Sequence, residues 1–120
     1  MNVKLIFFLF TVVIFLFVGC NSSTSSNVDC NGITPTYNAD IAPILTANCA
    51  ADGCHGNFLT QAGINLTTFS GAKNGSANSK FLKAIKHQSG AESMPPSPAT
   101  KLSDDNILLI ECWIQNGKPE

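Results

Sequence analysis

An almost uninterrupted apolar run from Leu5 to Val18 follows Lys4 at the start of the chain. A basic residue followed by an apolar run of this length is typical of a signal peptide, whereas a membrane-spanning helix needs about 20 apolar residues. We therefore predict that residues 1–20 are a signal peptide. The fold must then be built from the more polar remainder of the chain.

The apolar run ends in the letters FVGC, which place a small residue directly before Cys20. This ending resembles the lipobox of bacterial lipoproteins, in which the cysteine becomes the lipidated first residue, although Phe17 stands where a leucine is usual. We expect Cys20 to anchor an exported protein to a membrane through its acyl chains, in the periplasm or at the cell surface. An ordinary secretory signal and an uncleaved anchor are the alternatives.

Residues 21–34 are rich in Ser and Asn and contain little that a core could bury. This composition predicts a flexible tether. We expect one folded domain over residues 35–120. A domain of that length has a small core, and it usually needs a disulfide, a metal or a cofactor for stability.

The charge balance argues against nucleic acid as a partner. The chain has seven basic residues, all of them lysine, and eight acidic residues, and loss of Lys4 with the signal peptide leaves six lysines. Nucleic-acid-binding domains usually have a basic balance and use arginine for bidentate contacts.

The apolar spacing predicts an all-α fold with three principal helices and no convincing strand. Residues 40–49 place Ile41, Ile44 and Leu45 on the same face as Cys49, with Asp40 as the expected N-cap.

The second principal helix is expected over residues 80–88, capped by Ser79 and stopped by Gly90. The third is expected over residues 104–116, between the N-cap Ser103 and the C-terminal Gly117.

Two further segments connect these helices. A short helical turn is expected to begin at Thr67 or Thr68. Residues 92–102 contain three closely spaced prolines, which exclude a helix or a central strand and predict a stiff, extended loop.

The segment NCAADGCHGN places four residues between Cys49 and Cys54, with His55 directly after the second cysteine. The usual signature for covalent haem attachment is C-x-x-C-H, with only two residues between the cysteines. Because the Cys-His end is unchanged, we expect the longer loop to bulge at Asp52 and Gly53. Cys49 and Cys54 are then predicted to attach haem c, with His55 as the proximal iron ligand.

Met94 is the predicted second axial ligand of the iron. It is the only methionine outside the signal peptide, and Pro95 and Pro96 follow it directly. A thioether ligand favours ferrous iron and suits an electron carrier, and the prolines restrict the backbone that holds it. His87, at the end of the second predicted helix, is the alternative distal ligand.

These pieces occur in an order that resembles the class I cytochrome c domain, and more closely the cytochrome c-like domains of exported bacterial proteins. The matching letters are DIAPIL, C…CHG, GINLTTFSGA, MPP and LS…WI…G, between Tyr37 and Lys118. The resemblance implies a small cytochrome c-like fold in which the N- and C-terminal helices cross around one covalently bound haem. It implies the same roles for Cys49, Cys54, His55 and Met94.

The cysteine count agrees with this assignment. If Cys20 carries lipid and two cysteines bind haem, Cys30 and Cys112 remain and can form a disulfide in an oxidising compartment. Two disulfides among the four other cysteines are the alternative, with three pairings. Cys112 could also be a small buried hydrophobe.

We therefore expect a monohaem c-type cytochrome that carries one electron at a time and is not an enzyme, because both axial positions of its iron are filled. Its partners would be redox proteins and the membrane, with no small-molecule substrate. Four lysines could dock an acidic partner, although a solvated helix face is the more ordinary interpretation; they are Lys73, Lys80, Lys83 and Lys86.

Three other functions remain open at this stage. The first is a disulfide-stabilised extracellular binding domain without haem. The second is a zinc site that uses Cys49, Cys54 and His55 with either His87 or Cys112. The third is a haem protein with a labile Met94 that acts as a peroxidase or a sensor.

Overall fold

A computed structural model describes residues 28–58 and 60–120. The predicted signal peptide and Cys20 lie outside the described residues. No helix within the described ranges is long and apolar enough to span a membrane.

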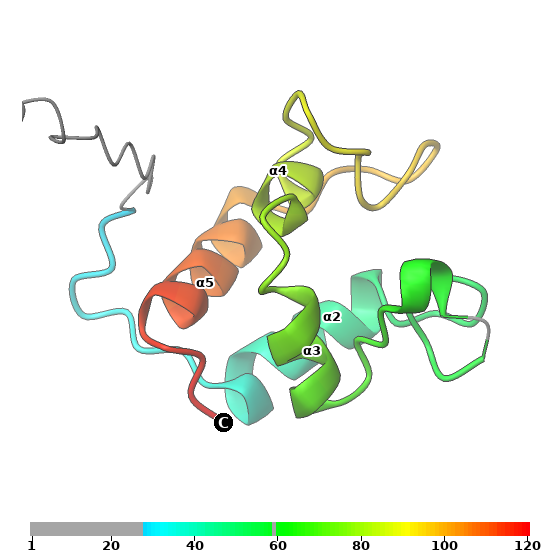
Figure 1. The fold of residues 1–120 in the computed structure, drawn as a ribbon. Helices are drawn as coiled ribbons and strands as arrows, with labels where there is room; N and C mark the ends of the chain where they lie inside the picture. Colours follow the sequence, from blue (N-terminus) through cyan, green and yellow to red (C-terminus); the bar gives the residue numbers. More distant parts are fainter. Residues whose placement is uncertain (1–27, 59) are drawn as a thin grey trace, which may run out of the picture.

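The described residues form helices and loops without a strand, which confirms the predicted all-α class (Figure 1). In chain order the elements are η2 (Tyr37–Ile41), α2 (Ala42–Asn48), η3 (Gln61–Gly63), α3 (Phe69–Gly75), α4 (Phe81–Ile85) and α5 (Asp104–Gln115).

The first helix begins earlier than predicted. Thr36, not Asp40, is its N-cap: the Thr36 hydroxyl accepts a hydrogen bond from the Ala39 N–H at 3.4 Å. The Asp40 carboxylate in turn accepts from the Thr36 N–H at 2.8 Å, so the two side chains satisfy the helix start reciprocally. The prediction that Asp40 caps the helix is therefore wrong, because that carboxylate is already inside the first turn.

The core lies where the first helix, α3, α4 and α5 meet. The Tyr37 ring stands 5.3 Å from the ring of Phe69 on α3 and 6.3 Å from that of Trp113 on α5, measured between centroids. Ile41 and Leu45 supply the buried stripe of the first helix, as the apolar spacing predicted. Burial of such side chains is the main stabilising contribution in a small domain.

The two ends of the folded region are joined by hydrogen bonds. The Pro119 carbonyl accepts from the indole N–H of Trp113 at 2.8 Å and from the backbone N–H of Tyr37 at 3.0 Å. Gly117 makes this return possible, because its φ of +85° ends α5 in the left-handed conformation. The Ser103 cap and the Gly117 end of α5 are confirmed.

The two short helices differ from their predicted extents. Thr68 caps α3, which continues for seven residues instead of a single turn. The prediction that α4 is capped by Ser79 and reaches residue 88 is wrong. Asn78 organises its start by accepting the Lys80 N–H at 2.9 Å, and α4 ends early because His87 takes a φ of +53°.

A disulfide joins Cys30 to Cys112 on α5. The Asn116 side chain also donates to the Ile33 carbonyl at 3.1 Å. Residues 28–34, at the end of the predicted tether, are thus attached to α5.

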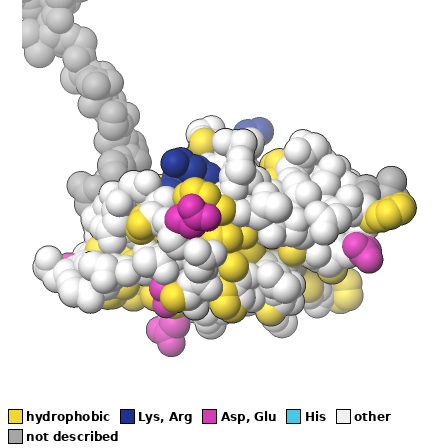
Figure 2. All heavy atoms as spheres, turned by 90° about the horizontal axis from the view of Figure 1, so that it is seen from below, with side chains coloured by type: hydrophobic (Ala, Val, Ile, Leu, Met, Phe, Trp, Pro, Cys, Tyr) yellow, Lys and Arg dark blue, Asp and Glu magenta, His cyan; other side chains and the backbone are white. Residues whose placement is uncertain are grey.

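The surface reflects a composition with only 12% charged residues. Figure 2 shows one face on which hydrophobic side chains are dispersed and charged side chains are few and scattered. This face carries no continuous basic patch among the residues described.

Candidate cofactor-binding site

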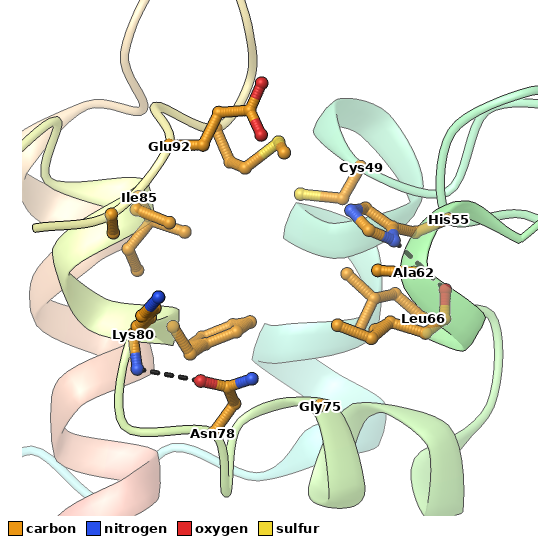
Figure 3. A pocket seen from close by; sticks show the side chains of 14 residues that line it. Cys49, His55, Ala62, Leu66, Gly75, Asn78, Lys80, Ile85 and Glu92 are labelled. Carbon is orange, nitrogen blue, oxygen red and sulfur yellow. Dashed lines mark hydrogen bonds between the residues drawn. The ribbon is translucent and has the colours of Figure 1, made fainter.

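Two adjoining cavities lie between the loop that follows α2 and the α4 region. Their volumes are about 230 and 300 Å³, and both are lined by Cys49, His55, Glu92 and Met94. Most of the remaining wall of the first cavity is apolar, and it includes Ile64, Leu66, Phe81, Ala84 and Ile85. Figure 3 shows Cys49, His55 and Leu66 on one side of this space, opposite Ile85 and Glu92. Mostly apolar walls with a few polar groups are typical of cofactor sites.

The loop between the two cysteines folds back on itself. Cys49 stands at the end of α2, and its carbonyl accepts the His55 N–H at 3.1 Å, so the two residues meet despite the two-residue insertion between the cysteines. The insertion is taken up by a turn in which Gly53 has a φ of +84°. Cys54 is exposed and lines the second cavity.

Gly56, directly after the histidine, is buried under this loop. A Cβ atom added there would lie 2.8 Å from the Ala50 carbonyl oxygen and 2.9 Å from that of Ala51, both in backbone that cannot easily yield. The G of the CHG letters is therefore required for close packing of the loop.

We expect Gly56→Ala to destabilise the protein by about 1–3 kcal/mol, as overpacking does in a well-packed site. Urea unfolding monitored by tryptophan fluorescence measures the loss. Ser70→Ala, on the exposed surface of α3, is the matched control and should change stability by no more than about 0.5 kcal/mol. Equal urea midpoints for Gly56→Ala and Ser70→Ala would contradict this expectation and show that the backbone at residues 50–51 moves to accept the added methyl group.

The His55 ring is oriented by the backbone that follows it. Its Nδ1 lies 3.0 Å from the Ile64 carbonyl oxygen. A carbonyl only accepts, so Nδ1 carries the proton and Nε2 keeps its lone pair. Metal-binding histidines commonly use such a second hydrogen bond to fix the ring and raise its basicity. His55 is thus prepared to ligate a metal through Nε2.

Met94 is held beside the same space by the end of α4. Its backbone N–H donates to the Ala84 carbonyl at 3.0 Å, and that oxygen also accepts from His87. The carbonyls at a helix C-terminus lack partners within the helix, so the returning loop satisfies one of them. The Pro-rich loop therefore brings a thioether to the cavity that His55 also lines.

The cavity lining is nearly neutral. The first cavity is lined by one lysine, Lys80, and by one acidic residue, Glu92, which also lines the second cavity. Burial, together with the nearby Cys54 thiol, raises the pKa of Cys49 to about 11. Cys49 is therefore a protonated thiol of low intrinsic reactivity at neutral pH.

The donor set fits haem c. Two thiols border the cavities, an imidazole offers a free Nε2, a thioether lies in the same lining, and the walls are apolar. If haem c is bound here, Cys49 and Cys54 would hold it covalently, and His55 and Met94 would ligate its iron.

The other predicted ligands are not gathered at this place. His87 is exposed and lines neither cavity, and Cys112 is buried in its disulfide. Within the described ranges, no group of three or more His, Cys, Asp or Glu side chains is placed to hold a metal ion.

Several residues of the site were not predicted as such. Glu92 lines the cavity, and its place two positions before the predicted ligand Met94 was a sequence signal that it belongs to the site. Lys80 was interpreted only as part of a solvated or docking helix face, whereas it lines the cavity. The carbonyls of Ile64 and Ala84 leave no sequence signal, because any residue supplies a backbone oxygen.

Comparison of the chain with family models, with curated proteins and with solved structures gives no match.

Proposed function

We propose that this protein is a monohaem c-type cytochrome that carries single electrons outside the cytoplasm. The observation that supports this best is the convergence of Cys49, His55 and Met94, from two separate chain segments, on one mainly apolar space that Cys54 borders. Lipid on Cys20 would keep the carrier at a membrane, where it exchanges electrons with partner redox proteins.

Attachment uses the two free cysteines. When haem c is bound, Cys49 and Cys54 would hold it through thioether bonds, because each thiol would add across one vinyl group, with its sulfur on the inner vinyl carbon and its proton on the outer one. Nothing leaves and no oxidant is consumed, so the step requires reduced thiols. The two cysteines are free in the structure.

The haem, when bound, supplies a one-electron couple between ferric and ferrous iron. His55 presents Nε2 because the Ile64 carbonyl holds its other nitrogen. Met94 offers a soft thioether from the opposite segment, which favours the ferrous form. With His55 and Met94 both ligating the iron, no coordination position would be left for a substrate, so the protein would act as a carrier and not as an enzyme.

Met94→Ala tests the assignment of the distal ligand in the haem-loaded protein. We expect loss of the low-spin visible spectrum and at least a tenfold loss of preference for ferrous iron, which is about 59 mV for a one-electron couple. Spectroelectrochemical titration measures both quantities.

Thr100→Ala, an exposed change in the same loop, is the control and should alter neither the spectrum nor the potential. A Met94→Ala variant that keeps the wild-type spectrum and potential would instead support an open iron site with catalytic or sensing behaviour.

A further inference from the structure

The two ends of the first cavity differ in charge. Cys49, His55 and Glu92 gather toward one end, whereas Asn78 and Lys80 lie at the other (Figure 3). Between these ends the wall is mainly apolar. A cofactor that is apolar in its middle and charged at one edge would thus meet the cationic group only at the Asn78–Lys80 end.

Asn78 positions Lys80 before α4. The Asn78 side-chain oxygen accepts the Lys80 N–H at 2.9 Å, and the Asn78 carbonyl accepts the Phe81 N–H at 3.0 Å. These two bonds fix the turn from which the Lys80 side chain reaches the cavity lining.

Lys80 and Asn78 each have side-chain hydrogen-bond donors without a partner among the described residues. The two ion pairs among the described residues use Lys86 and Lys101, and neither involves Lys80. Asn78 uses its oxygen in the turn, and its NH₂ group donates to no described residue. An ammonium and an amide donor thus line the same end of the cavity without an anionic partner among the described residues.

We propose that Lys80 and the Asn78 amide bind the propionate carboxylates of the haem, an assignment that rests on the proposed function. Haem carries its two carboxylates on the edge opposite its two vinyl groups. Because Cys49 and Cys54 hold the vinyl edge, the carboxylate edge is directed away from them, toward Asn78 and Lys80. Glu92 lies at the cysteine end, where its negative charge would repel a carboxylate.

Hydrogen bonds between an ionised donor and a carboxylate are among the strongest in proteins. Lys80 therefore acts as a positioning residue for the carboxylate edge. Its positive charge at the carboxylate edge would also favour the less positive ferrous state. Removal of that charge should lower the midpoint potential.

The test uses the full, haem-loaded chain. In the reduced wild-type protein, nuclear Overhauser effects are expected between the propionate methylene protons and the side chains of Lys80 and Asn78. In Lys80→Gln, the ferrous-to-ferric ratio at a fixed applied potential should fall roughly two- to tenfold.

Lys83→Gln is the matched control. Lys83 is exposed on α4, three residues after Lys80, and does not line the cavity, so its replacement should remove the same charge with a clearly smaller shift. Lys80→Arg keeps the charge and should keep the wild-type ratio.

The outcomes separate this inference from the proposed function. If the wild-type chain takes up no covalent haem, both are overturned. If haem is attached but the propionate contacts are to Glu92 or Pro96, or if Lys80→Gln and Lys83→Gln shift the ratio equally, only the role of Lys80 is overturned. The wild-type contacts decide the question even if a Lys80 variant fails to fold.

Discussion

Replacing Cys49 and Cys54 together by alanine should abolish covalent haem attachment. The thioether bonds are the covalent links in the proposed site, so the purified double variant should have the mass of the polypeptide alone and lose its colour in denaturing gels. Each single variant keeps one link and should retain haem in reduced yield. Intact-mass spectrometry, with haem staining of the gel, measures both effects.

The disulfide variant Cys30→Ala/Cys112→Ala is the control for this result, because it removes two cysteines that lie outside the cavities. It should retain covalent haem at the wild-type stoichiometry. Full retention of covalent haem by the Cys49→Ala/Cys54→Ala double variant would contradict the assignment of these two residues.

Loss of the Cys30–Cys112 disulfide should cost about 2–5 kcal/mol of unfolding free energy, the range for small exported domains. The bond closes a sequence separation of 82 residues, so it strongly restricts the unfolded chain. Cys112 is also fully buried on α5 beside Trp113, and two alanines would leave a gap in that packing.

Urea unfolding with and without a reductant measures this contribution. The reductant should lower the midpoint of the wild-type protein toward that of Cys30→Ala/Cys112→Ala and leave the double variant unchanged. Equal midpoints for the oxidised wild type and the double variant would show that the bond contributes nothing to stability.

The order of neighbouring residues in the sequence was sufficient to predict α5 and the all-α fold class. Ser103 is followed by two acidic residues and an apolar stripe, and Gly117 ends the pattern, so both ends of α5 follow from neighbouring residues. The first helix was harder to delimit. Its start depends on a reciprocal Thr36–Asp40 pair and on the Pro119 carbonyl, which returns from the far end of the chain.

The extent of α4 could not be predicted for a similar reason. The residues up to Gln88 have helical spacing, but His87 adopts a left-handed conformation and ends the helix. The Ala84 carbonyl at this end then accepts a hydrogen bond from the backbone N–H of Met94 in the Pro-rich loop. This long-range contact overrides the local preference for a longer helix. It also brings the thioether to the cavity.

The lysines show how tertiary contacts change the interpretation of a charged stretch. They were predicted to share either a docking role or a solvated face. In the structure Lys86 pairs with the buried Glu111 on α5, while Lys80 lines the cavity. Sequence spacing alone places both lysines in the predicted helix over residues 80–88 and cannot assign them to different neighbours.

The visible spectrum of the full chain, produced with a haem-maturation system, tests the central claim most directly. A c-type cytochrome with His55 and Met94 as ligands should show sharp low-spin bands after reduction and keep its haem on denaturation. A colourless protein from several maturation systems, with Cys49 and Cys54 detected by mass as unmodified thiols or as a disulfide, would contradict the claim.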